Sequence, residues 1–174
     1  MAEALTLEID VLCEDPRWEE AGLDEMTETA LRATLGHLGL GNGFELSVLG
    51  CDDARIAGLN AEFRGKPAAT NVLSWPAEER AADTPGARPE PPAEPELGDI
   101  AIAYETCRKE ADSQRKPFRN HVLHLICHAV LHCLGYDHID DADATLMEDT
   151  ERAILASLGV PDPYDTLTGA PDAP

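Results

Sequence analysis

The stretch 128-HAVLHCLGYDH-138 carries histidines at its first, fifth and eleventh positions and a glycine at its eighth. Residues four apart lie on the same face of a helix, so His128 and His132 are expected to project together. Gly135 can adopt the left-handed conformation that ends a helix, and the chain can then double back so that His138 faces the last turn. The spacing therefore predicts three imidazoles gathered at the C-terminal end of one helix.

Three imidazoles with a fourth position left open are typical of a catalytic rather than a structural zinc site. We therefore expect one zinc ion per chain, with nickel able to take its place. Periodicity alone also allows the pair His124 and His128. His124 and His132 cannot both bind one ion, because eight residues of helix separate them by about 12 Å. Gly135 and His138 favour the pair His128 and His132.

Two nearby residues are candidates for supporting roles. Asp137 adjoins His138 and could either orient a ligand imidazole or cap the following helix. His124 lies one turn before His128 and could support the ligands or face a substrate, although a purely structural histidine is an equal alternative.

Metallopeptidases with this histidine spacing place a glutamate directly after the first histidine, where it takes a proton from the attacking water. Ala129 occupies that position and cannot do so. A different reaction is the simplest interpretation, and phosphodiester hydrolysis can depend more on stabilisation of charge than on a carboxylate base. A zinc metallopeptidase-like hydrolase remains an alternative on spacing alone.

Composition limits the class of protein. The chain has 174 residues, of which 43% are hydrophobic, enough for one globular domain. Its five cysteines are odd in number and form no CxxC pair, which argues against a disulfide framework and against thiolate zinc ligation. The net charge of −21 argues against a general nucleic-acid coat protein. However, the segment 108-RKEADSQRKPFR-119 is locally basic, so a cationic groove remains compatible with the sequence.

No apolar run reaches the ~18 residues that a membrane span needs. The N-terminal sequence MAEALTLEID lacks the basic start and apolar core of a signal peptide. We therefore expect a cytoplasmic protein with no membrane partner.

Hydrophobic periodicity predicts four strands and about five helices. The strands are expected over 4–13, 44–49, 71–75 and 97–103, and the helices over 23–38, 52–64, 104–112, 118–134 and 141–158. Because these elements do not alternate as βαβ units, the predicted fold class is α+β. The acidic, proline-rich residues 77–96 are interpreted as a mobile surface loop rather than a linker.

Beyond these patterns, HAVLHCLGYDH resembles the signature of the YbeY family of endoribonucleases, whose usual form is HGxLHLxGYDH. The block 59-LNAEFRGKPAATNVLSWP-76 is similar to the family's LNxxYRGxxxPTNVLSFP, and 97-LGDIAIAYETCRKEA-111 is similar to its LGDIxI block. The resemblance covers roughly residues 5–165. It departs from the usual pattern at Ala69, Trp75, Ala129 and Cys133, none of which removes a histidine or the arginine of the YRG block.

The resemblance implies one α+β domain over residues 1–165, and the sequence TLTGAPDAP predicts a frayed tail over 166–174. The expected fold is a mixed four-stranded sheet packed under the helices, with a zinc site at a helix C-terminus formed by His128, His132 and His138. Arg64, an ordinary surface arginine by its sequence context, becomes the expected catalytic residue, and Lys66 joins it in contacting RNA.

The function implied by the resemblance is that of a zinc-dependent, single-strand-specific endoribonuclease. Its expected role is ribosomal RNA processing, notably maturation of the 3′ end of 16S ribosomal RNA, together with ribosome quality control. The implied partners are ribosomal RNA, the small ribosomal subunit and its assembly factors. A non-enzymatic, ribosome-associated module with a structural zinc is a further alternative.

Overall fold

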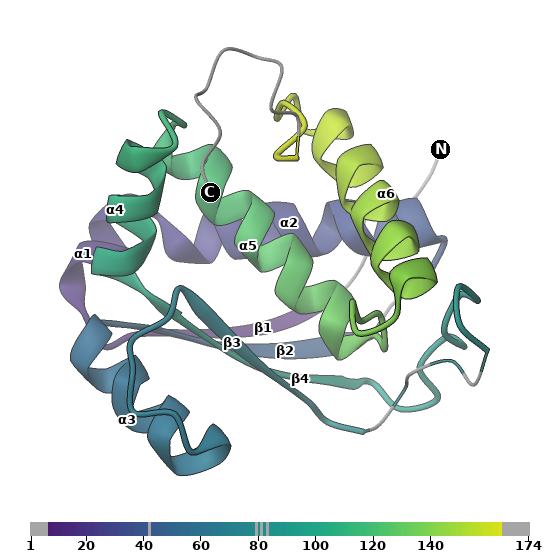
Figure 1. Ribbon diagram of the computed structural model, residues 1–174, viewed down its shortest axis with the longest axis horizontal. Coiled ribbons are helices and arrows are strands. Elements are labelled where there is room, and N and C mark those ends of the chain that lie inside the picture. Colours follow the sequence, from purple (N-terminus) through teal and green to yellow (C-terminus); the bar gives the residue numbers. More distant parts are fainter. Residues whose placement is uncertain (1–6, 42, 79, 81, 83, 165–174) are drawn as a thin grey trace.

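The computed structural model describes residues 7–41, 43–78, 80, 82 and 84–164 (Figure 1). The strands are β1 (Leu7–Cys13), β2 (Phe44–Cys51), β3 (Val72–Pro76) and β4 (Glu96–Ala103). The helices are α1 (Pro16–Ala21), α2 (Leu23–Leu38), α3 (Asp53–Arg64), α4 (Tyr104–Ser113), α5 (Phe118–Cys133) and α6 (Asp141–Ser157). The predicted α+β class is confirmed. The start of the first predicted strand, residues 4–6, and the predicted frayed tail, residues 166–174, lie outside the described residues.

The four strands form one mixed sheet in the order β1-β2-β4-β3. β1 pairs with β2 and β2 with β4 in parallel, whereas β3 runs antiparallel to β4 and forms an edge of the sheet. The register aligns Val48 with both Val11 and Ile100, and Ile100 with Ser74. The mixed four-stranded sheet is therefore also as predicted.

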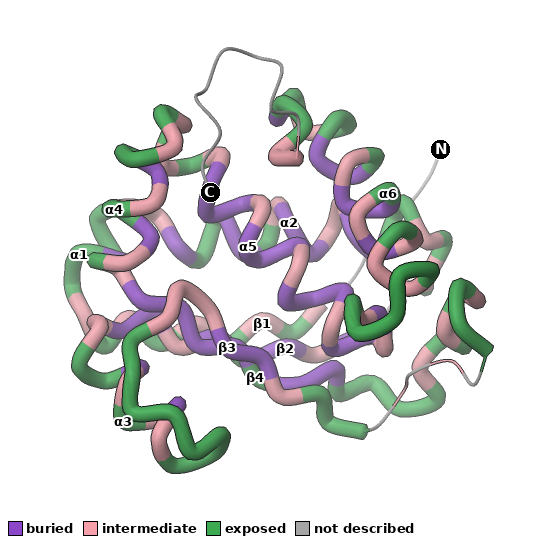
Figure 2. Tube along the Cα trace, viewed as in Figure 1, coloured by how far each residue is buried: buried purple, intermediate pink, exposed green. Residues whose placement is uncertain are grey.

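Helices α2 and α5 pack over one face of the sheet, and α3 lies on the opposite side (Figure 1). The main core lies between the sheet and α5, where Leu46, Ile100 and Ile102 meet Ile126 and Leu131. Figure 2 shows burial concentrated along α5 and the central strands. Helix α5 is held in place because the sheet and other helices pack around it. The histidines on its remaining face therefore project from a well-packed backbone.

One helix of the described chain was absent from the sequence prediction. Asp15 caps α1 by accepting a hydrogen bond from the Arg17 backbone N–H at 2.9 Å, and Pro16 supplies a preset first helical residue. Trp18 anchors the helix because its ring is buried and its Nε1–H donates to the Cys51 carbonyl at 3.0 Å. A helix of six residues is too short to show hydrophobic periodicity, which explains the omission.

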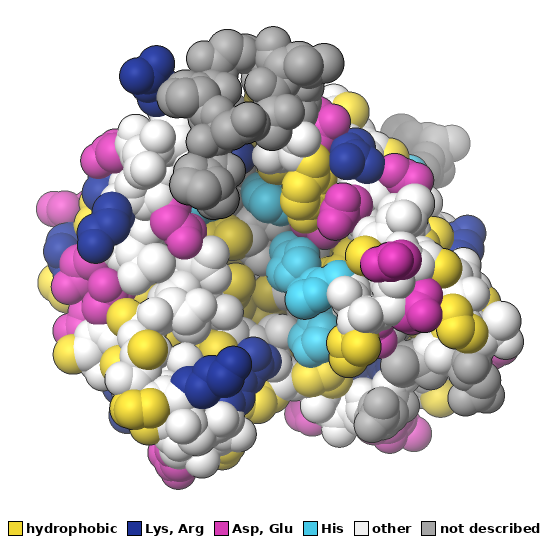
Figure 3. Space-filling view, in the orientation of Figure 1, with side chains coloured by type: hydrophobic (Ala, Val, Ile, Leu, Met, Phe, Trp, Pro, Cys, Tyr) yellow, Lys and Arg dark blue, Asp and Glu magenta, His cyan; other side chains and the backbone are white. Residues whose placement is uncertain are grey.

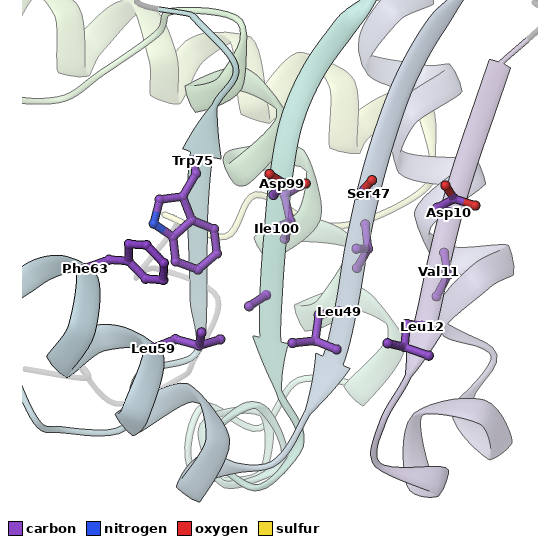
Figure 4. A pocket seen from close by; sticks show the side chains of 12 residues that line it. Asp10, Val11, Leu12, Ser47, Leu49, Leu59, Phe63, Trp75, Asp99 and Ile100 are labelled. Atoms are coloured by element: carbon purple, nitrogen blue, oxygen red, sulfur yellow. The ribbon is translucent and has the colours of Figure 1, made fainter.

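Helix α3 covers the other face of the sheet only in part. Beside it lies an open trough of about 750 Å³, whose walls include Leu49, Phe63 and Trp75 (Figure 4). Asp10 and Asp99 lie toward one end of this trough, but it contains no histidine and no arginine. The chemically versatile side chains gather instead on the α5 side of the sheet.

No helix in the described part of the chain combines the length and the apolar character needed to cross a membrane.

Candidate active site

The histidines of α5 open into a cavity of about 450 Å³ between α5, β3 and the chain that follows α5. The chemically functional side chains in its wall are Arg64, Asn71, Ser74, His124, His128, His132, Asp137, His138 and Tyr164. Figure 3 shows histidine side chains clustered in a hollow of the surface, with lysine and arginine side chains at its edge. The fold thus places all three predicted ligand histidines, and Arg64, around one cavity.

The chain reverses after α5 as the glycine predicts. Gly135 has φ +107°, and the Tyr136 N–H returns to donate to the Leu131 carbonyl at 3.0 Å. After this turn the His138 ring stacks on His128, with ring centroids 5.6 Å apart. Gly135 is required for a second reason, which the sequence does not reveal. A Cβ at this position would lie 2.2 Å from the Arg80 carbonyl oxygen, closer than any real contact.

Arg80 anchors the loop between β3 and β4 beneath the histidine turn. Its guanidinium donates to the carbonyls of Glu96 at 2.8 Å, Leu97 at 2.9 Å and Cys133 at 3.1 Å, and its side chain is only 6% exposed. The Cys133 carbonyl belongs to the last turn of α5, where carbonyls lack helical partners and attract a cation. The segment 77–96 was predicted as a mobile surface loop, and at Arg80 it is instead fixed to the core.

Substitution Arg80→Met should lower the free energy of unfolding by about 2–4 kcal/mol, because buried carbonyls lose a charged donor. Equilibrium urea denaturation measures this change. Arg88→Met is the matched control, since Arg88 lies in the same loop but is exposed. Equal losses in the two variants would show that Arg80 does not anchor the loop.

Glu151 of α6 is a residue of the site that the sequence interpretation missed. Its side chain is 0% exposed and approaches His124 Nε2 at 2.8 Å, His128 Nδ1 at 3.1 Å and the Tyr164 hydroxyl at 3.0 Å. Burial opposes ionisation, but the hydrogen bonds from His124 and His128 outweigh it and lower the pKa of Glu151 to about 2. The signal was present in the sequence: Glu151 shares the buried stripe of α6 with Met147.

His124 has no nitrogen free for the cavity. Its Nε2 faces Glu151 and the Tyr164 hydroxyl, the latter at 3.3 Å, and its Nδ1 is enclosed without a hydrogen-bond partner in the part of the chain that the structure describes. Burial lowers the pKa of His124 despite the nearby carboxylate, which favours a neutral ring. Of the two histidine pairs that periodicity allows, the structure therefore favours His128 and His132.

The nitrogen donors of His128, His132 and His138 are of the kind that a zinc site uses. Among residues 7–41, 43–78, 80, 82 and 84–164, however, no three His, Cys, Asp or Glu side chains are arranged to hold a metal ion. His128 and His132 each use Nδ1, toward Glu151 and toward the Tyr136 carbonyl at 3.3 Å. Burial lowers the pKa of His132, so the ring is held in the neutral form that can coordinate a metal. Both rings thus keep Nε2 for other partners, as metal-binding histidines do.

Asp137 lies in the cavity wall but does not cap the next helix. Its Oδ1 accepts a hydrogen bond from the Ile139 backbone N–H at 3.3 Å, within the turn that carries His138. Helix α6 is capped instead by Asp140, which accepts from the Ala142 N–H at 2.8 Å. The capping alternative for Asp137 is therefore wrong.

Arg64 is the last residue of α3 and is exposed at the cavity. Neither Arg64 nor Lys66 forms an ion pair or hydrogen bond through its side chain with the residues that the structure describes. Lys66 lies two positions further on, outside the cavity wall. The basic segment 108–119 is placed elsewhere: Arg119 pairs with Glu25, and Arg108 lies 4.2 Å from the Phe118 ring centroid. Of the Lys and Arg side chains that the structure describes, the one in the wall of the histidine cavity is thus Arg64.

The fold and this cavity together define a class: a small α+β protein with a candidate active-site cleft that is lined by histidines and has an arginine at its wall. Comparison with known proteins narrows the class. The family model described as "Endoribonuclease YbeY" matches residues 8–159. The chain belongs to the YbeY endoribonuclease family.

Individual relatives agree with this assignment. A Paracoccus denitrificans protein named Endoribonuclease YbeY is 62% identical over 156 residues, covering 90% of this chain and 89% of its own length. A Jannaschia protein of the same name is 56% identical over 160 residues, covering 91% and 100%. A solution structure from Thermotoga maritima aligns with a TM-score of 0.52 at 18% identity, covering 94% of this chain and 99% of that one, and supports the fold alone.

Proposed function

We propose that this protein is a cytoplasmic, zinc-dependent endoribonuclease that cuts single-stranded segments of ribosomal RNA, notably in maturation of the 3′ end of 16S ribosomal RNA and in ribosome quality control. Its partners would be ribosomal RNA and the small ribosomal subunit with its assembly factors. One observation carries the proposal: the guanidinium of Arg64, which has no partner among the residues that the structure describes, faces the same cavity as His128, His132 and His138.

The residues divide the work according to their chemistry. His128, His132 and His138 would hold the zinc, which when bound supplies positive charge that can activate water or stabilise a phosphate oxygen. Arg64 would grip the scissile phosphate, because its planar fork can donate to two phosphate oxygens and remains charged at any working pH. Lys66 would contact a neighbouring phosphate and so help to position the strand.

Ala129 argues against the metallopeptidase alternative. It lies in the cavity wall beside His128, where a peptidase of this pattern would carry its glutamate. A non-enzymatic module with a structural zinc is the second alternative. A structural site would require a fourth protein ligand, whereas the donor set proposed here has three.

Incubation with structured RNA and with casein, each with and without a chelator, tests the proposal. We expect cleavage of RNA alone, loss of cleavage with the chelator, and about one zinc per purified chain. His132→Ala should release the metal, whereas His37→Ala, at an exposed histidine of α2, should retain it. Full zinc occupancy in the His132 variant would exclude this ligand set, and intact RNA with zinc still bound would favour the non-enzymatic module.

A further inference from the structure

The buried carboxylate of Glu151 accepts hydrogen bonds from three side chains. Helix α6 presents its carboxylate to α5, so that Oε1 lies 2.8 Å from His124 Nε2 and Oε2 lies 3.1 Å from His128 Nδ1. The Tyr164 hydroxyl completes the arrangement at 3.0 Å from Oε1. Each carboxylate oxygen therefore has a separate histidine, and the carboxylate links helix α5 to the segment that follows α6.

The chemistry of these contacts determines where the protons lie. A glutamate at neutral pH is ordinarily a carboxylate, and carboxylate oxygens can only accept hydrogen bonds. His128 must then donate through Nδ1–H. A neutral imidazole that carries its proton on Nδ1 has a lone pair on Nε2. The Nε2 of His128 is thus left as a ligand atom, on a ring that lines the cavity.

We propose that Glu151 is a positioning residue, which holds His128 in the Nδ1–H tautomer and in the ring orientation that offers Nε2 to a metal. The inference rests on the proposed function for its purpose, but its physical content, the tautomer of one histidine, does not require a metal. Tyr164 supports the same carboxylate and thereby joins the segment 161–164, which follows α6, to the site.

The competing explanation is that Glu151 only stabilises the fold. A second carboxylate–histidine pair of the same protein serves as a control for that explanation. Glu110 of α4 makes a similar contact with His121 of α5, Oε1 to Nε2 at 2.8 Å, without touching His128. Glu110→Gln therefore imposes the same chemical change on a carboxylate–histidine pair of the same helix. It should leave the His128 tautomer unaltered.

The critical variant is Glu151→Gln. Its amide keeps one acceptor oxygen and replaces the other by an NH₂ donor. With the oxygen toward His124 and Tyr164, two of the three hydrogen bonds survive and the NH₂ faces His128 Nδ1. That nitrogen must then accept, so the proton of His128 should move to Nε2, the atom needed for a metal.

Long-range ¹H–¹⁵N NMR of the metal-free protein distinguishes the two tautomers, because protonated and unprotonated ring nitrogens differ widely in chemical shift. We expect His128 in the Nδ1–H form in the unmodified protein and in Glu110→Gln, and in the Nε2–H form in Glu151→Gln. An unmodified protein with the proton on Nε2 would overturn the proposal, and so would a Glu151→Gln protein that keeps it on Nδ1. If Glu151→Gln does not fold, Glu151→Asp, which keeps two acceptor oxygens, should show the Nδ1–H form.

Zinc affinity provides an independent measurement. Competition with a chromophoric chelator should show affinity about 10- to 100-fold weaker in Glu151→Gln, as is typical when the partner of a ligand histidine is removed. An unmodified protein that binds no zinc would contradict the proposed function, while the tautomer comparison would still decide the role of Glu151. Weaker zinc binding with an unchanged tautomer would instead overturn the role of Glu151 and leave the zinc site intact.

Discussion

Arg64→Ala should cleave RNA roughly 100- to 1000-fold more slowly than the unmodified protein while it retains its zinc. The physical reason is that charge builds on the phosphate oxygens in the transition state, and a preorganised donor in the cleft stabilises it. Loss of one such donor typically costs about 2.7–4 kcal/mol of transition-state stabilisation. Arg64 is expected to act in this way because its guanidinium faces the histidine cavity without a carboxylate partner in the described chain.

Single-turnover cleavage rates, measured with the metal content of each variant, test this expectation. Arg64→Lys should recover only part of the rate, because the charge returns but the two-pronged donor does not. Arg55→Ala is the control, since Arg55 is an exposed arginine at the other end of α3 that pairs with Glu14. An Arg64→Ala protein that cuts at the unmodified rate would remove Arg64 from the mechanism.

Gly135→Ala should destabilise the protein by about 4 kcal/mol or more, a large effect for one methyl group. A positive φ costs an alanine about 1–2 kcal/mol, and the new Cβ would meet the Arg80 carbonyl oxygen at 2.2 Å. The obstacle is backbone, so either the loop at Arg80 or the turn before His138 must move. Denaturant unfolding measures the loss of stability, and zinc binding should weaken with it if the turn is the part that moves.

Gly159→Ala separates the cost of backbone strain at a positive φ from the cost of the clash with the Arg80 carbonyl oxygen. Gly159 also has a positive φ, +75°, but a Cβ there would meet nothing within 4 Å. This variant should therefore cost only the backbone strain, about 1–2 kcal/mol. Equal destabilisation of the two variants would mean that the contact between Arg80 and Gly135 is not a constraint on the fold.

The sequence was most informative where the pattern is local. Helix α5, its end at Gly135 and the return of His138 all follow from spacings within a few residues, and the structure shows each of them. The contacts that complete the site are not local: Arg80 reaches the Cys133 carbonyl across 53 positions, and Glu151 reaches His124 across 27. Neither has a periodic signature, because a single side chain meets a partner that only the tertiary fold brings near.

The distribution of charged residues along the sequence was a poor indicator of which cations lie at the candidate active site. The basic segment 108–119 suggested a groove, but Arg119 is paired with Glu25 and is not part of the histidine cavity's wall. Arg64 had no special feature in its sequence context, and only the resemblance of its YRG-like block to a family pattern promoted it. That no carboxylate of the described residues pairs with it could be recognised only once those carboxylates had positions in space.

The order of elements along the chain has a consequence for biosynthesis. All four strands precede α5, and the central β2–β4 pairing joins segments about fifty residues apart, a contact that forms slowly because a long loop must close. A chain made from its N-terminus thus emerges with its sheet residues first, then the histidines of α5, and only at the end Glu151 and Tyr164. The cleft is the last region to be completed, and a chain truncated before α6 would expose its histidines without the carboxylate that orients them.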